Sequence, residues 1–128
     1  MLLDDITVLF VDDDADTQNM IGSLLNLYFK EVFLAEDGQE GLDIYKEKHP
    51  DIVISDITMP RMCGLEMSRE IKKIDSDQKI SLFTARDGLS YHEEAVEIGI
   101  DTFLVKPFDE EQFFNSLHYL AMSLEEEI

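Results

Sequence analysis

The chain has 128 residues, a length typical of one domain, and 45% of them are hydrophobic, which is enough to form an independent core. Asp and Glu number 29 against 10 Lys and Arg, so the formal net charge is −19. Such a charge disfavours binding to nucleic acid or to an anionic membrane surface and favours cations and basic partners.

Five short apolar runs rich in β-branched residues predict five strands. Their residues are apolar at consecutive rather than alternate positions, which is typical of strands buried on both faces of a parallel sheet. In chain order, the runs lie at residues 6–11, 32–35, 52–55, 80–83 and 102–105.

Helices are predicted between these runs and after the last one. Asp14 or Asp16 is expected to cap the first helix. The second helix has the weakest pattern, because Gly38 and Gly41 lower helix propensity, although His49-Pro50 marks its end. In the other helices, the apolar positions at helical spacing are Ile21, Leu24, Leu25 and Tyr28, then Met67, Ile71 and Ile74, then His92, Ala95, Val96 and Gly99, and finally Phe113, Leu117 and Leu120.

The alternation of strands and helices predicts an α/β fold: a three-layer α/β/α sandwich with five parallel strands and five helices. We expect residues 1–128 to form a single domain. No apolar run approaches the roughly 18 residues of a membrane span. Cys63 is the one cysteine, so no intrachain disulfide can form, and we expect a cytoplasmic protein without membrane contact.

Polar residues follow four of the predicted strands, where ligands bind in open α/β sheets. They are Asp12 and Asp13 after the first strand, Asp56 after the third, Thr84 after the fourth and Lys106 after the fifth. Asp56 ends a strongly apolar run, a position that disfavours a carboxylate unless it is paired or coordinated.

Together these residues can accept a phosphoryl group. A carboxylate can attack phosphorus if the charge on the phosphoryl oxygens is neutralised. Crowded carboxylates require a hard divalent cation, and Mg²⁺ or Mn²⁺ suits an all-oxygen site. Lys106 could reach a second phosphoryl oxygen, and the Thr84 hydroxyl could donate a hydrogen bond to a third.

The motifs that carry these residues resemble those of the response-regulator receiver domain, the phosphoacceptor module of two-component signalling. They are VLFVDDD, Asp56-Ile57-Thr58-Met59-Pro60, Thr84-Ala85 and Lys106-Pro107-Phe108. The resemblance implies the strand order 2-1-3-4-5 and phosphorylation of Asp56. It also implies that Asp13 binds the metal directly, Asp12 mostly through water, and Thr58 through its main-chain carbonyl.

The same resemblance implies further roles. Thr84 and Phe103 would form the switch that responds to phosphorylation, with Phe103 in place of the commoner tyrosine. Thr58 and Arg86 would tune the lifetime of the phosphoryl group. The peptide bond before Pro107 is expected to be cis, as it is in the family.

The implied phosphodonor is a histidine kinase or a histidine phosphotransfer protein. The chain would not be a conventional enzyme, but it would catalyse its own phosphorylation and dephosphorylation. Phosphorylation would change the face formed by the fourth helix, fifth strand and fifth helix, near Tyr91, His92, Phe103 and Phe113. That face would bind an output domain, a partner protein or a second copy of the chain.

Two alternatives remain open. A pseudo-receiver would act as an interaction module without phosphorylation, although all five chemical residues are present here. A phosphohydrolase of the haloacid dehalogenase kind would use Asp12 as nucleophile, but Asp16 stands where that family has Thr or Val. The sequence does not decide whether the chain acts alone or belongs to a longer protein with an output domain.

Overall fold

Strands and helices alternate along the chain, as the apolar pattern predicts. The structure is a computed structural model that describes residues 3–84, 89–105 and 109–126. After a short 3-10 helix at Leu3–Asp5, the strands are β1 (Thr7–Val11), β2 (Glu31–Ala35), β3 (Ile52–Asp56), β4 (Lys79–Thr84) and β5 (Thr102–Val105). The α-helices are α1 (Ala15–Tyr28), α2 (Gly38–Lys48), α3 (Gly64–Ile74), α4 (Leu89–Ile98) and α5 (Glu110–Glu126).

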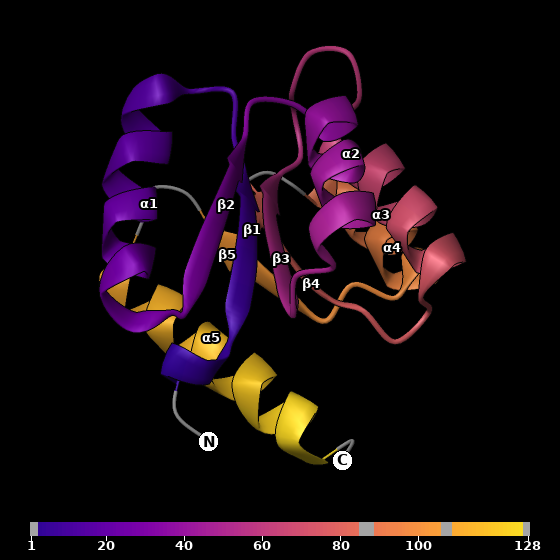
Figure 1. Ribbon diagram of the computed structural model, residues 1–128. Helices are drawn as coiled ribbons and strands as arrows, with labels where there is room; N and C mark the ends of the chain where they lie inside the picture. Colours follow the sequence, from indigo (N-terminus) through magenta and orange to yellow (C-terminus); the bar gives the residue numbers. More distant parts are fainter. Residues whose placement is uncertain (1–2, 85–88, 106–108, 127–128) are drawn as a thin grey trace.

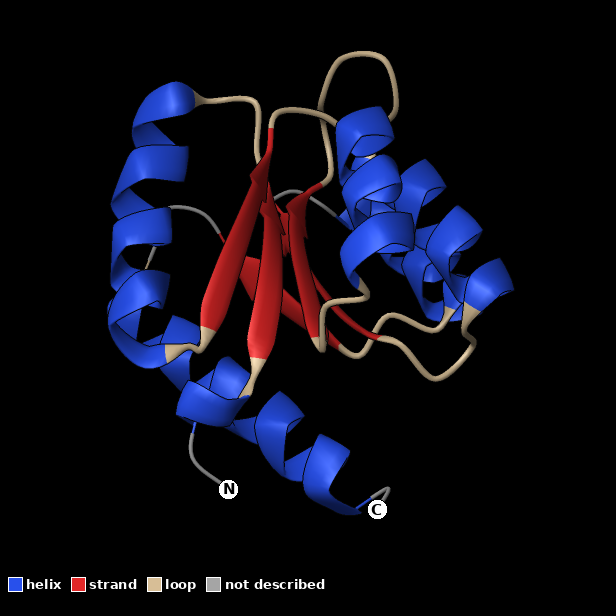
Figure 2. Ribbon diagram, in the orientation of Figure 1, coloured by secondary structure: helices blue, strands red, loops and turns tan. Residues whose placement is uncertain are grey.

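The five strands form one parallel sheet in the order β2-β1-β3-β4-β5, which confirms the expected topology (Figures 1 and 2). In the register, Val11 lies beside Ala35 on one side and Ser55 on the other, and Asp56 lies beside Phe83. The carboxyl ends of β1, β3 and β4 therefore meet at one edge of the sheet. Residues 12, 13 and 56 are brought to this edge by the strands themselves.

Two helical layers cover the sheet, with α1 and α5 on one face and α2, α3 and α4 on the other (Figure 1). Successive residues of β1 point to opposite faces: Val8 and Phe10 join the core under α1 and α5, whereas Leu9 and Val11 join the core under α2 and α3. Burial on both faces explains why the central strands are apolar at consecutive positions.

The expectation of burial on both faces is wrong for β2, which is one of the two edge strands of the sheet. Val32 and Phe33 are only partly buried, and Leu34 is 37% exposed. An edge strand has a sheet neighbour on one side only, so the helices cover it less completely than β1 and β3.

Some helical positions predicted as core are exposed instead. Tyr28 is 46% exposed, Ile74 48% and Val96 58%, because they lie at the margins of the apolar stripes or at the last helical turn. Gly99 lies beyond α4 with φ at +94°, a left-handed conformation that terminates a helix and suits glycine.

The two helical layers differ in charge. Neither α1 nor α5 contains Lys or Arg, whereas α2 and α3 contain Lys46, Lys48, Arg69, Lys72 and Lys73. Acidic residues occur on both sides of the sheet. Within the described part of the chain, no helix combines the length and apolarity that crossing a membrane requires.

Candidate functional site

Three carboxylates converge at the carboxyl edge of the sheet. Asp12, Asp13 and Asp56 each place one carboxylate oxygen within 4.8 Å of the others. Asp12 is 1% exposed, Asp56 is intermediate and Asp13 is exposed, so the cluster runs from the core to the solvent. The sequence predicted this convergence from the positions of the residues at the ends of the first and third strands.

The backbone holds Asp12 in place. Its N–H donates to the carbonyl of Ala35 at 3.1 Å, which extends the pairing of β1 with β2. Its Oδ1 accepts a hydrogen bond of 2.9 Å from the N–H of Asp14. The Gln18 side chain donates to the carbonyl of Ala35 at 2.9 Å and so ties α1 to the same strand ends.

Asp14 lies next to the cluster but has a different task. It is the N-cap residue of α1, and its Oδ2 accepts hydrogen bonds from the backbone N–H and the hydroxyl of Thr17 at 3.0 and 2.5 Å. The expectation that Asp14 or Asp16 caps this helix is confirmed for Asp14.

Asp56 ends β3 with its carboxyl group oriented by the chain. The N–H of Ile57 donates to Asp56 Oδ1 at 2.8 Å, and the buried Ser55 hydroxyl donates to the carbonyl of Asp56 at 2.7 Å. The loop that follows is compact: Gly64 N–H donates to the carbonyl of Ile57 at 2.7 Å. A Cβ at Gly64 would lie 2.2 Å from the carbonyl oxygen of Asp56, so this close approach requires glycine.

An ion pair that the sequence analysis missed lies beside this loop. Arg61 Nε and Nη2 donate to Oδ2 of Asp37 at 2.8 and 2.5 Å. Asp37 also caps α2 through a 2.9 Å bond from the N–H of Glu40. Burial acts to raise the pKa of Asp37, but the bonds from Glu40 N–H and Arg61 outweigh it, so the pKa lies below its usual value of 3.8.

The donor set fits a hard divalent cation. The cluster offers only carboxylate oxygens, the ligands that Mg²⁺ and Mn²⁺ prefer. Mg²⁺ binds oxygens at about 2.0–2.1 Å, so oxygens on one ion lie within about 4 Å of each other, close to the spacing found here. Thr58, whose main-chain carbonyl was expected as a further ligand, is an exposed residue of the loop after Asp56.

Several predicted residues fall outside what the structure describes. Arg86, Lys106 and Pro107 are not among the described residues, and the side chains of Thr84, Tyr91 and His92 are not described either. Thr84 is the last residue of β4, and its backbone lies beside that of Val105 on β5.

The predicted switch and output residues occupy different surroundings. Phe103 on β5 is partly buried and packs on the core under α2, α3 and α4. Phe113 was also named near the face that phosphorylation would change, but it lies in the core, as its place in the apolar pattern of the last helix predicts. It is 1% exposed, and its ring stacks on that of Phe83 at 5.9 Å between centroids, because it faces the sheet from the first turn of α5.

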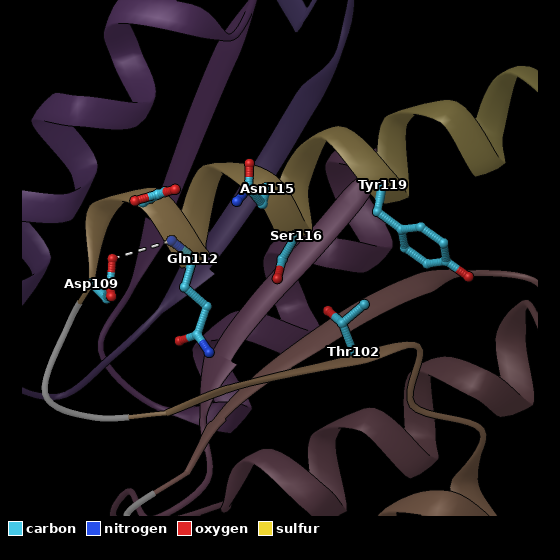
Figure 3. Close-up of a pocket in the computed structure, with 7 residues that line it drawn as sticks. Thr102, Asp109, Gln112, Asn115, Ser116 and Tyr119 are labelled. Atoms are coloured by element: carbon cyan, nitrogen blue, oxygen red, sulfur yellow. Dashed lines mark hydrogen bonds between the residues drawn. The ribbon is translucent and has the colours of Figure 1, made fainter.

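A groove of about 440 Å³ lies between β5 and α5. Figure 3 shows Gln112 and Ser116 of α5 pointing toward the side of Thr102 on β5. Asp109 accepts a 3.2 Å hydrogen bond from the N–H of Gln112 and, with Glu111, makes part of the groove lining acidic.

Known proteins are similar to this chain in sequence and in fold. The family model for the response regulator receiver domain matches residues 8–118. Response regulator MprA of Mycolicibacterium vanbaalenii is 35% identical over 115 residues, which cover 90% of this chain and 50% of that protein. The probable transcriptional regulator ycf27 of Porphyridium aerugineum is 35% identical over 101 residues, covering 79% of this chain and 42% of that protein. The chain thus spans about half the length of the curated relatives it matches.

Solved structures agree with the sequence match. The N-terminal domain of an uncharacterized protein from Wolinella succinogenes has a TM-score of 0.89 and 29% identity, covering 97% of this chain and 100% of that one. The chemotaxis response regulator CheY4 of Vibrio cholerae has a TM-score of 0.81 and 29% identity, with 90% and 98% covered. The chain belongs to the response regulator receiver domains of two-component signalling.

Proposed function

We propose that the chain is a single receiver domain that accepts a phosphoryl group on Asp56 in a reaction requiring Mg²⁺ or Mn²⁺. The observation that carries the proposal is the convergence of Asp12, Asp13 and Asp56 within 4.8 Å at the carboxyl edge of the sheet. Three crowded carboxylates are unfavourable by themselves, and a bound cation converts them into a site for an anionic group.

The reaction follows from the position of Asp56. A carboxylate oxygen of Asp56 attacks the phosphorus of the donor, the bond to the leaving group breaks, and an aspartyl phosphate forms. The 2.8 Å bond from Ile57 N–H orients the attacking carboxyl group. When bound, the cation neutralises charge on the phosphoryl oxygens. Water later attacks phosphorus, which releases phosphate and restores the carboxylate.

The other residues complete this proposal. Asp13 and the carbonyl of Thr58 bind the cation directly, and Asp12 binds it mostly through water. Lys106 and Thr84 contact the phosphoryl oxygens. Thr58 and Arg86 tune the lifetime of the phosphoryl group.

The signal passes from Thr84 and Phe103 to the α4, β5 and α5 face. The groove between β5 and α5 supports this part of the proposal, because it offers a concave surface whose lining includes the acidic residues Asp109 and Glu111. Such a surface suits a basic partner. The donor is a histidine kinase or histidine phosphotransfer protein of the cytoplasm, and the receiver of the signal is an output domain, a partner protein or a second copy of the chain.

Intact mass spectrometry tests the phosphoacceptor. Incubation with a small phosphodonor and Mg²⁺ is expected to add about 80 Da, the mass of one phosphoryl group. Asp56→Asn should abolish the adduct, because an amide is a poor nucleophile. Asp14→Asn is the matched control, since it removes a neighbouring carboxylate that caps α1 and should keep the adduct.

An adduct that persists in Asp56→Asn, or that forms equally well in the presence of a chelator, would contradict the proposal. Loss of the adduct in Asp12→Asn but not in Asp56→Asn would instead support the phosphohydrolase alternative. That alternative is disfavoured by the family match and by the 1% exposure of Asp12.

A further inference from the structure

The loop between β3 and α3 is fastened to the start of α2 at two adjacent points. One is the ion pair of Arg61 with Asp37. The other is a backbone hydrogen bond of 3.0 Å from Gly38 N–H to the carbonyl of Met62. Two successive residues of the loop thus contact the N-cap and the first residue of α2, which fixes both the position and the direction of the loop at this point.

The ion pair is well placed to hold the loop. The side chain of Asp37 is 8% exposed and that of Arg61 64%, so the carboxylate is largely removed from water. Charge-assisted hydrogen bonds to a desolvated carboxylate are stronger than those between exposed groups. Asp37 accepts from Glu40 N–H through Oδ1 and from Arg61 through Oδ2, so both of its oxygens are engaged.

Helix α2 provides a firm anchor for the loop. A Cβ at Gly38 would lie 2.3 Å from the carbonyl oxygen of Met62, so the backbones of helix and loop are in direct contact. A Cβ at Gly41 would lie 2.8 Å from Sδ of Met67 and 2.9 Å from a methyl group of Val11. The helix therefore packs tightly against both α3 and β1, the strand that directly precedes Asp12 and Asp13.

The backbone conformation of Arg61 indicates that contacts between the loop and α2 constrain the loop at this residue. Its φ angle is +64°, in the left-handed region that residues with a side chain rarely adopt. A conformation of this kind persists only where surrounding contacts determine it, and such positions cluster at functional sites. Here the contacts are the ion pair and the neighbouring Gly38–Met62 hydrogen bond.

We propose that the Arg61–Asp37 pair positions the loop after Asp56 so that the carbonyl of Thr58 completes the divalent cation site. The inference rests on the proposed function. Arg61 is a positioning residue: it lies three positions beyond Thr58 and acts through the loop backbone. Loss of the pair lets the loop depart from the binding geometry, so the affinity for Mg²⁺ falls while the nucleophile stays in place.

Mg²⁺ titrations of Arg61→Ala and Asp37→Asn test the inference. Affinity is measured by calorimetry or amide chemical shifts on the whole chain, with folding checked by circular dichroism. We expect the Kd for Mg²⁺ to rise about tenfold, the lower end of the loss seen when groups supporting metal ligands are removed. The Mg²⁺ concentration that half-saturates phosphorylation should rise by the same factor, while the rate at saturating Mg²⁺ stays near that of the parent.

Arg61→Gly separates positioning from stability. Glycine adopts the left-handed conformation without strain, so this variant should be more stable than Arg61→Ala, yet it should still bind Mg²⁺ weakly because the guanidinium is gone. Arg69→Ala is the matched control. Arg69 forms a 2.6 Å ion pair with Glu94 between α3 and α4, and its removal should leave the Kd for Mg²⁺ within about twofold of the parent.

If Arg61→Ala, Arg61→Gly and Asp37→Asn all bind Mg²⁺ as tightly as the parent, the pair is only structural and the inference is overturned. The Mg²⁺ titration of the parent chain tests the proposed function separately. If the parent chain itself fails to bind Mg²⁺, the proposed function is overturned and the inference with it.

Discussion

The crowding of Asp12, Asp13 and Asp56 is expected to make the metal-free protein less stable than it would be with one carboxylate fewer. We expect Asp13→Asn to raise its stability, because Asp13 is the exposed member of the cluster and asparagine preserves its shape without its charge. In the presence of Mg²⁺ the parent chain should instead be more stable than Asp13→Asn, because it binds the cation more tightly than the variant does.

The size of the effect follows from the separation of the charges. At the 4.8 Å limit of the cluster, two unit charges repel by about 0.9 kcal/mol in water and about 3.5 kcal/mol at an effective dielectric constant of 20. Because Asp13 is exposed, the lower part of this range applies, and we expect Asp13→Asn to gain about 1 to 2 kcal/mol. For a chain of this length, that corresponds to a rise in Tm of about 4 to 8 °C.

Thermal unfolding followed by circular dichroism measures the Tm of the metal-free protein in the presence of a chelator and the Tm of the cation-bound protein in the presence of Mg²⁺. At a Mg²⁺ concentration 100 times its Kd, the parent chain gains about 2.7 kcal/mol, which exceeds the advantage of the variant. Asp16→Asn is the control: it removes the same charge from the first turn of α1, outside the cluster, where a carboxylate favours the helix.

The electrostatic reasoning would be refuted if Asp13→Asn had the same Tm as the parent, or a lower one, without metal. If Asp16→Asn raised the metal-free Tm by a similar amount, the effect would come from the net charge of the chain rather than from the cluster. A Mg²⁺-induced rise in Tm as large in Asp13→Asn as in the parent would remove Asp13 from the cation site.

Three further outcomes are expected. Gly64→Ala should lower the free energy of unfolding by about 1 to 3 kcal/mol in urea titrations, because its Cβ would lie 2.2 Å from the carbonyl oxygen of Asp56; an unchanged midpoint would contradict this. Ser68→Ala should leave stability unchanged or raise it by up to about 1 kcal/mol, since the buried hydroxyl has no hydrogen-bond partner among the described residues; a clear loss would reveal one. The lowered pKa of Asp37 gives stability that is fully present above pH 3.8 and is lost as the pH falls through the folded pKa. The stability difference between the parent and Asp37→Asn should therefore be constant near neutral pH and shrink below about pH 4, and a constant difference down to pH 2 would contradict the assignment.

The sheet could be predicted because its central strands are buried on both faces, so β1 and β3 read as unbroken apolar runs. Helix α2 was the hardest to predict, and the structure gives the reason. Gly38 and Gly41 weaken the helical pattern, yet both are required where α2 touches the loop at Met62 and the core at Val11. At these two positions glycine lowers the helix propensity but allows the close tertiary contact.

The carboxylate cluster could also be predicted, because the carboxyl ends of parallel strands meet at one edge and Asp12, Asp13 and Asp56 directly follow such strands. The ion pair of Arg61 with Asp37 could not. Its partners are 24 residues apart, and Arg61 has a left-handed backbone conformation that its residue type does not indicate. An acidic residue before a helical pattern signals an N-cap at Asp37, but nothing in the sequence indicates the residue that pairs with it.

The unequal charge of the two helical layers gives the molecule an electric dipole across the sheet. Helices α1 and α5 carry five acidic side chains and no Lys or Arg, a net charge of −5, while α2, α3 and α4 carry eight acidic and five basic side chains, a net charge of −3. Both layers attract a basic partner, and the difference of two charges gives such a partner a small preference for the α1 and α5 side before any contact forms. This orienting effect acts on the rate of association rather than on the lifetime of the complex, and it should weaken as salt shortens the range of the field.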